Sequence, residues 1–327
     1  MQMLSLGSSG LPVSQIGLGL AAVGRPGYIT LGRDEDLGSD RSVDALRDRA
    51  HSLLDAAYAG GVRYVDVARS YGLAEQFLAS WLDRRTFPLG HMTVGSKWGY
   101  RYVADWQVGA DVNEVKDHSL AHLRRQLAES RALLGDRLRL YQIHSATLES
   151  GVLEDGEVLR ELKMLGDTGL AIGLTVSGPH QADVVRRALE IRVDGRNPFA
   201  SVQATWNPLE PSVGAALAEA REAGWGVIVK EALANGRLTS RSRQSLPGPL
   251  GSLSRRLGRT PDAVAIAAAI AQPWSDVVLS GAVTPVQLSS NLEAVEVMLS
   301  PDDLAELAAL AEPPERYWEK RSSLAWT

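Results

Sequence analysis

Short β-prone runs alternate with amphipathic helical segments along the whole chain, and this alternation limits the folds that it can adopt. Strands are predicted at 14–19, 62–66, 92–97, 138–144, 170–176, 200–205, 225–230 and 276–280. Helices are predicted at 43–59, 72–84, 112–134, 154–166, 179–190, 212–223, 261–271 and 285–299. Strands that alternate with helices in this way form a parallel sheet from βαβ units. Eight such units predict an α/β protein with a (β/α)8 TIM barrel, whose active site lies at the C-terminal ends of the strands.

The organisation of the chain indicates a single domain over residues 1–327, because no Ser/Gly linker or change in composition divides it. Three stretches lie outside the strand–helix repeat. Residues 24–42 form a polar loop, whereas the loop 98–110 and the extended C-terminal tail 313–327 contain several aromatic residues. Long loops of a barrel are often functional. Their aromatic rings are equally compatible with a structural role, in which packing anchors the loops.

The composition excludes several classes of protein. The formal net charge is −5 and no stretch is dense in Lys or Arg, so there is no electrostatic footprint for nucleic acid. The N-terminus lacks the basic and apolar regions of a signal peptide, and the longest apolar run, 263–271, is too short to span a bilayer. The absence of cysteine excludes disulfides, thiolate metal sites and thiol nucleophiles. We therefore expect a soluble, cytoplasmic protein that binds neither nucleic acid nor membranes.

Four polar residues of complementary type lie at or just after the ends of three neighbouring predicted strands. Asp66 ends the second strand, and Tyr71 lies in the loop that follows it. Lys97 ends the third strand and His144 ends the fourth. Neighbouring strands lie about 4.8 Å apart, so these four side chains can converge although they are far apart in sequence.

This combination suggests proton transfer by Tyr71. A free tyrosine has a pKa of about 10 and is a poor proton donor or acceptor at neutral pH. The Lys97 ammonium is expected to lower that pKa, and Asp66 to hold Lys97 in place and charged. His144 would orient a substrate carbonyl or share in the proton transfer. Tyr71 would then protonate a carbonyl oxygen as hydride reaches the carbonyl carbon.

Each of these residues also has an ordinary structural explanation. Asp66 could form an Asx turn, Lys97 could be solvated, and His144 could be a neutral residue with satisfied hydrogen bonds. Four complementary types at neighbouring strand ends nevertheless favour catalysis. His118 and His122 have the i, i+4 spacing of a metal pair on a helix, but no third ligand is evident nearby. We therefore predict an exposed helix surface there and no metal site.

The motifs that carry the four residues resemble those of the aldo-keto reductase superfamily: DVARSYG at 66–72, VGSKWG at 94–99 and LYQIHS at 140–145. The likeness extends over nearly the whole chain. The N-terminal stretch LGSSGLPVSQIGLGLAAVG resembles the family's N-terminal β-hairpin and first barrel strand. Four later stretches resemble the family's strands five to eight with their cofactor loops: IGLTVSG, VQATWN, KEALANGRL and SGAVTPVQLSSNLEA. The resemblance implies an NAD(P)H-dependent carbonyl reductase, with Tyr71 as general acid/base and Asp66, Lys97 and His144 in support.

The resemblance also implies which residues would bind the coenzyme: Gly19, Thr175, Gln203, Lys230, Leu233, Asn235, Arg237, Ser280, Gly281, Gln287 and Asn291. Two positions depart from the family pattern. Val176 stands where relatives have an Asn that holds the nicotinamide carboxamide, so this contact is weakened or moved to Ser177. Lys230 stands where many relatives stack an aromatic ring on the nicotinamide. A cation at this position would disfavour the oxidised nicotinamide, or would pair instead with Glu231 or a cofactor phosphate.

The choice between the two nicotinamide coenzymes is open. Residues 280–291 contain no Lys or Arg to bind the 2′-phosphate of NADPH. Arg237 is the predicted replacement. The resemblance to the family favours NADP(H). The lack of a cation at 280–291 means that NAD(H) is not excluded.

The substrate is predicted to be a small carbonyl compound, bound at the barrel mouth between aromatic side chains: Trp98, Tyr100, Trp106, Trp206, Trp318 and Trp326. Two other functions are compatible with the sequence. One is a nicotinamide-binding regulatory or interaction subunit with little turnover. The other is a barrel isomerase that uses Tyr71 and Lys97 without net redox chemistry.

Overall fold

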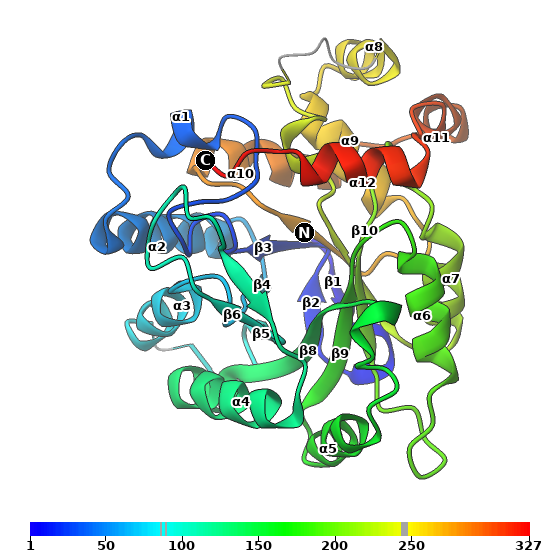
Figure 1. Ribbon diagram of the computed structural model, residues 1–327. Coiled ribbons are helices and arrows are strands. Elements are labelled where there is room, and N and C mark those ends of the chain that lie inside the picture. Colours follow the sequence, from blue (N-terminus) through cyan, green and yellow to red (C-terminus); the bar gives the residue numbers. More distant parts are fainter. Residues whose placement is uncertain (86, 89, 243–247) are drawn as a thin grey trace.

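The computed structural model describes residues 1–85, 87–88, 90–242 and 248–327 and contains a closed barrel of parallel strands (Figure 1). The barrel strands follow one another in chain order: β3 (Ile16–Gly19), β4 (Tyr64–Asp66), β5 (Thr93–Trp98), β8 (Leu138–Ala146), β9 (Ala171–Val176), β10 (Ser201–Thr205), β11 (Gly226–Lys230) and β12 (Val277–Ser280). The barrel closes where β12 pairs with β3, with Val278 opposite Ile16. All of the predicted strands are present, with ends shifted by no more than two residues. The predicted (β/α)8 barrel is confirmed.

Helices between the strands surround the barrel (Figure 1): α2 (Val43–Ala59), α3 (Ala74–Asp83), α4 (Leu120–Leu134), α5 (Gly156–Asp167), α6 (Gln181–Glu190), α7 (Gly214–Glu222), α9 (Pro261–Ile270) and α10 (Pro285–Leu292). Their apolar faces pack against the strands and form the main core. The side chains of Thr260 and Thr284 cap the first backbone N–H groups of α9 and α10, and a proline follows each cap. These helices start where the sequence provides a cap.

The predicted helix at 112–134 is wrong in its first part. Residues Glu114–Lys116 form strand β7, which pairs antiparallel with β6 (Tyr100–Tyr102). Helix α4 begins only after Ser119, whose hydroxyl accepts a hydrogen bond from the His122 backbone N–H. The predicted helix at 285–299 is also shorter, since a 3-10 turn (Glu293–Glu296) follows α10.

The described residues contain further helices that the sequence did not predict: α1 (Arg33–Leu37), α8 (Gly248–Leu257), α11 (Pro301–Ala308) and α12 (Pro314–Ser322). Helix α1 lies in the polar loop 24–42, and α12 lies in the C-terminal tail. Short 3-10 turns complete the secondary structure at Gly7–Ser9, Gly135–Arg137, Leu148–Ser150 and Ala234–Gly236. None of the helices in the described ranges combines the length and hydropathy that crossing a membrane requires.

An N-terminal hairpin covers one end of the barrel. Strands β1 (Met3–Ser5) and β2 (Pro12–Ser14) pair antiparallel, and Leu6 after β1 is fully buried. Leu6 packs where Gly226 of β11 has no side chain, because a Cβ there would lie 2.4 Å from Leu6 Cγ. Leu6 belongs to an apolar cluster at this end of the barrel, with Leu11, Val13, Tyr64, Leu140, Ile228 and Val277. The hairpin therefore leaves only the C-terminal ends of the strands open for a site.

Candidate active site

The four residues predicted to form a catalytic cluster lie together at the C-terminal ends of β4, β5 and β8. A close ion pair joins Lys97 Nζ to Asp66 Oδ1, and both side chains are almost completely buried. Lys97 Nζ also donates to the Val67 carbonyl at 3.0 Å. The ammonium lies 4.8 Å from the centre of the Tyr71 ring, which lies 5.4 Å from the His144 ring at an angle of 84°. A phenol, an ammonium, a carboxylate and an imidazole thus meet in one place.

Asp66 accepts two further hydrogen bonds inside the barrel. Tyr64 OH donates to Asp66 Oδ2 at 3.1 Å, and Gln203 Nε2 donates to the same oxygen at 2.9 Å. The Tyr64 ring lies beside two glycines of the neighbouring strands. A Cβ at Gly17 would come within 2.8 Å of the ring, and a Cβ at Gly95 within 2.4 Å of its hydroxyl.

Tyr64 was not among the residues predicted from the sequence. The available signal was its position two residues before Asp66, which places both side chains on the same face of β4. The strand therefore aims the Tyr64 phenol into the barrel interior below the carboxylate.

The pKa of Tyr71 shifts in the direction opposite to the prediction. Burial of the phenol and the Asp66 carboxylate raise the pKa of Tyr71 well above its usual value of 10.0, and the Arg25 guanidinium only partly opposes this. The prediction considered the Lys97 ammonium and omitted burial. Tyr71 is therefore held as a neutral phenol, which has a proton to donate.

His144 is held neutral. Burial, together with the cations Lys97, Arg25 and Lys230, lowers the pKa of His144 well below 6.5. Its Nδ1 lies 3.3 Å from the Ser70 hydroxyl. When that hydroxyl donates to Nδ1, the proton of the neutral ring is on Nε2, where it can bond to a substrate oxygen.

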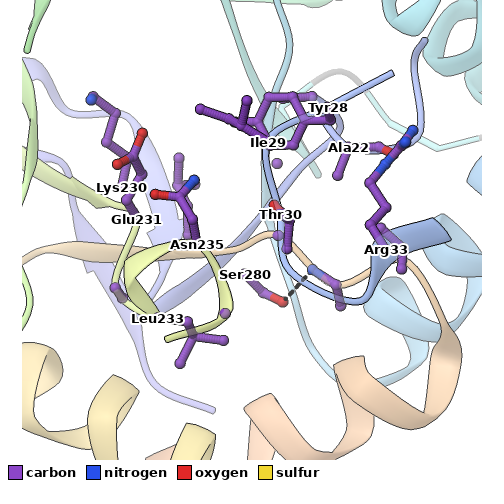
Figure 2. A pocket seen from close by; sticks show the side chains of 18 of the residues that line it. Ala22, Tyr28, Ile29, Thr30, Arg33, Lys230, Glu231, Leu233, Asn235 and Ser280 are labelled. Atoms are coloured by element: carbon purple, nitrogen blue, oxygen red, sulfur yellow. Dashed lines mark hydrogen bonds between the residues drawn. The ribbon is translucent and has the colours of Figure 1, made fainter. Parts of the chain in front are cut away.

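A cavity of about 730 Å³ extends from this cluster between the loops that follow the strands. Asp66, Tyr71 and His144 line it, whereas Lys97 does not and lies behind Asp66. Figure 2 shows part of the cavity, with Tyr28 to Arg33 of the loop after β3 facing Lys230 to Asn235 of the loop after β11. Leu31 N donates to the Asn235 carbonyl at 3.0 Å, so these two loops touch.

Most of the predicted coenzyme residues line the cavity: Gly19, Thr175, Gln203, Lys230, Leu233, Asn235, Ser280, Gly281, Gln287 and Asn291. Three of the amides already have partners. Gln203 bonds to Asp66, Gln287 Nε2 donates to Asp36 Oδ2 at 2.6 Å, and Asn291 Nδ2 donates to Asp262 Oδ2 at 2.8 Å. Val176 is fully buried and does not line the cavity, whereas Ser177 does.

The structure places Arg237 away from the cavity in which the coenzyme was expected. Arg237 does not line the cavity but forms an ion pair with Glu312 at 2.6 Å and lies over the Tyr317 ring of α12. The sequence did not predict this partner because it lies 75 positions further along the chain. Arg241 lines the cavity instead and pairs with Asp36.

The predicted aromatic walls fall into two groups. Tyr100, Trp318 and Trp326 line the cavity, whereas three others do not and have structural roles: Trp98, Trp106 and Trp206. Trp98 is fully buried in the core and contacts His118. Trp106 Nε1 donates to the Arg41 carbonyl at 2.8 Å.

Trp206 packs against Trp274, with ring centres 5.7 Å apart. The error at Trp98 has a simple cause. Consecutive side chains of a strand point to opposite faces, so Trp98 points outward because Lys97 points into the barrel.

Two loop residues that the sequence analysis did not single out border the tetrad. Arg25 is buried, donates to the Ser70 carbonyl at 3.1 Å and pairs with Glu114 at 2.8 Å. Tyr28 and Thr327 exchange two backbone hydrogen bonds, at 3.1 and 3.0 Å, so the chain terminus is fastened to the first loop. The only sequence feature that could have indicated Arg25 or Tyr28 was their position in the polar loop 24–42.

The two histidines considered as a metal pair are not on an exposed helix surface. His118 precedes α4 and its Nε2 lies 3.0 Å from the His144 carbonyl, while His122 is buried. Over the described part of the chain no group of three or more His, Cys, Asp or Glu side chains is placed to hold a metal ion.

The family model for aldo/keto reductases matches residues 38–312. The chain belongs to the aldo-keto reductase family. Members of this family use nicotinamide coenzymes and act on small carbonyl compounds, so membership implies NAD(P)H-dependent carbonyl oxidoreduction.

Individual relatives are distant in sequence, and some of them match this chain over nearly their whole length. The chain is 24% identical to the uncharacterized oxidoreductase YrpG of Bacillus subtilis, over 97% of this chain and 99% of that protein. Aldo-keto reductase AKR11C1 from Bacillus halodurans, solved in its holo form, has a TM-score of 0.69 at 23% identity and covers 96% of this chain and 97% of its own. Glycerol dehydrogenase AKR11B4 from Gluconobacter oxydans has a TM-score of 0.70 at 21% identity, with 94% of each chain covered. At these identities the two structures support the fold.

The residues present fit a nicotinamide coenzyme. One end of the cavity is lined by Asp66, Tyr71 and His144, where a hydride donor is needed, and the hydroxyls of Thr175 and Ser177 lie beside it. The other end reaches Ser280 and the first turn of α10, where Ser280 Oγ donates to Asn291 Oδ1 at 2.7 Å. The volume of the cavity is also in the range of cofactor sites.

Proposed function

We propose that the protein reduces an aldehyde or ketone to an alcohol with NAD(P)H, and that Tyr71 is the proton donor. The observation that carries this proposal is the buried ion pair of Asp66 and Lys97 beside Tyr71 and His144, next to a cavity with the volume of a cofactor site. The reduced nicotinamide, when bound, supplies the hydride. The chain supplies the proton and holds the carbonyl.

Each residue of the tetrad has a distinct role in this proposal. The neutral His144 ring donates a hydrogen bond to the carbonyl oxygen and orients it. Tyr71 transfers its phenolic proton to that oxygen as hydride reaches the carbon, so an alcohol and a phenolate result. The Lys97 ammonium stabilises the phenolate, and Asp66 fixes Lys97. Solvent then returns a proton to Tyr71.

The direct test is coenzyme oxidation, followed by absorbance at 340 nm, with NADPH or NADH and a panel of aldehydes and ketones. Tyr71→Phe should lower kcat by about 100-fold or more, because it removes the general acid. Fluorescence titration should show that this variant still binds the coenzyme. Coenzyme binding without turnover of any carbonyl would favour a regulatory subunit, and conversion of a carbonyl with no change in coenzyme would favour an isomerase.

We further propose NADP(H) as the preferred coenzyme, with Arg241 as the cation that favours the 2′-phosphate. Arg241 lines the cavity in the same region as Gln287, and both contact Asp36, whose oxygens are thereby engaged. Arg241→Ala should weaken NADPH binding by about tenfold and leave NADH binding nearly unchanged. Arg237→Ala is the matched control. Equal losses for both coenzymes in Arg241→Ala would exclude this role.

A further inference from the structure

The charges around the catalytic end of the cavity are not fully paired. Three cations have carboxylate partners, in the pairs Arg25–Glu114, Lys97–Asp66 and Arg321–Glu231. Lys116 and Lys230 also line the cavity, but neither forms an ion pair with a carboxylate of the described residues. Lys116 is exposed to solvent, whereas Lys230 is half-buried. A cation that is partly removed from water without an anion is unfavourable, so the surroundings of Lys230 suit a negatively charged ligand.

Lys230 is held in place by hydroxyl groups. Its Nζ donates to Thr205 Oγ1 at 2.8 Å and to Ser177 Oγ at 3.1 Å. An ammonium has three hydrogens, so these two bonds leave one for a ligand. Burial lowers the pKa of Lys230 to about 8, which still leaves the side chain mostly charged at pH 7.

The neighbouring acid does not neutralise Lys230. Glu231 directs both carboxylate oxygens at Arg321 Nε of α12, at 2.8 and 3.0 Å. The pKa of Glu231 is lowered to about 2, chiefly by Arg321 and then by Lys230, against the effect of burial. Its carboxylate oxygens therefore bond to the C-terminal helix, and Glu231 acts on Lys230 only through its charge.

Lys230 lies close to the tetrad. It is one of the cations that lower the pKa of His144, and its Nζ lies 5.9 Å from the centre of the Trp318 ring. Lys116 approaches the same region, because its Nζ donates to the Ser145 carbonyl at 3.1 Å next to His144. In Figure 2 the Lys230 ammonium points away from Ser280. An anion bound by Lys230 would therefore belong to the substrate rather than to a coenzyme phosphate.

We propose that the carbonyl substrate of this protein carries a carboxylate, and that Lys230 binds this carboxylate beside the tetrad. The inference rests on the proposed function for the identity of the reacting group. Lys230 acts as a specificity residue, while Tyr100 and Trp318 provide apolar surface for the rest of the substrate. Lys116 adds a second positive charge at the same end.

Ligand binding tests the inference independently of turnover. The probes are 4-(hydroxymethyl)benzoate and its neutral amide, 4-(hydroxymethyl)benzamide, which have nearly the same size and shape. Calorimetric titration at pH 7 into the full-length protein saturated with NADP⁺ should give a Kd about tenfold lower for the benzoate, the effect of one charge-assisted hydrogen bond. Lys230→Met should abolish this preference and leave the affinity for the amide within about twofold.

Two further variants make the result specific. Lys230→Gln keeps polar contacts to Ser177 and Thr205, so it covers the case in which the methionine variant does not fold. Lys163→Met removes a lysine of α5 that pairs with Asp167, and it should change neither affinity.

Equal affinity of the unmodified protein for the benzoate and the amide would overturn the inference. An equal loss of affinity for the benzoate and the amide in the Lys230 variants would also overturn it. So would Lys230 variants that bind NADP⁺ more weakly but still prefer the benzoate to the amide. Failure of every aldehyde to oxidise the coenzyme would instead count against the proposed function.

Discussion

At its N-terminal end the barrel closes over apolar side chains of the hairpin and strands, whereas at its C-terminal end the same strands hold buried ionisable groups. Leu6 and the aliphatic side chains of its cluster are almost completely shielded from solvent and need no partners other than one another. Asp66 and Lys97 are equally shielded, but each is stable there only because the other is present. The first end therefore contributes stability through burial, and the second holds reactive groups whose burial has to be offset.

The two ends also differ in how the chain closes them. The N-terminal end is covered by a hairpin that is local in sequence. The C-terminal end is bordered by the first loop and the C-terminal segment, which meet where Tyr28 and Thr327 exchange backbone hydrogen bonds. Substitutions at the two ends should thus have separable effects on stability and on activity.

The largest effect is expected from Lys97→Met, which leaves Asp66 buried without its cation. We expect the free energy of unfolding in urea to fall by about 3–5 kcal/mol, and kcat to fall by about 100-fold or more. The double variant Asp66→Asn/Lys97→Met removes both charges. It should recover most of the stability and none of the activity. A single variant as stable as the original protein would show that Asp66 finds another partner.

Leu6→Ala at the opposite end should affect stability alone. Truncation of this fully buried side chain removes apolar contacts and leaves a cavity against Gly226. We expect the free energy of unfolding, measured in urea, to fall by about 2–5 kcal/mol. At a temperature where the variant is folded, kcat/KM should stay within about twofold of the original value. A clear fall in kcat would mean that the hairpin end and the tetrad are coupled.

The barrel could be predicted from the sequence because each strand is a short apolar run between helical segments, a pattern that depends only on neighbouring residues. Structure that depends on distant partners was missed. Strand β7 was assigned to a helix because Glu114–Lys116 is extended only by pairing with Tyr100–Tyr102. Helix α12 lies in a polar segment and is tied to the rest of the protein by contacts such as Arg321–Glu231, 90 positions apart.

The positions of the tetrad could be predicted because the ends of parallel strands converge wherever the barrel closes. The direction of individual side chains could not. Trp98 was assigned to the substrate site although it follows Lys97 on the same strand and so faces the other way. Arg237 was assigned to the coenzyme because Glu312 could not be foreseen as its partner.

Tyr64 joins the two ends, and its substitution should have the smallest effect. Its ring belongs to the apolar cluster with Leu6, while its hydroxyl donates to Asp66. Tyr64→Phe keeps the ring and leaves Asp66 with Lys97 and Gln203 as donors. We expect kcat to fall by about two- to tenfold with KM unchanged, since one hydrogen bond that positions the tetrad is lost.

The matched control for Tyr64→Phe is Tyr58→Phe on α2. It removes a phenol oxygen from a ring that packs against Trp81 and Phe87, outside the cavity. The control should leave kcat unchanged, and the pH profile of kcat should move only in Tyr64→Phe. An unaltered kcat and pH profile in Tyr64→Phe would show that Lys97 and Gln203 alone position Asp66. The apolar end of the barrel would then support the tetrad only by keeping the strands together.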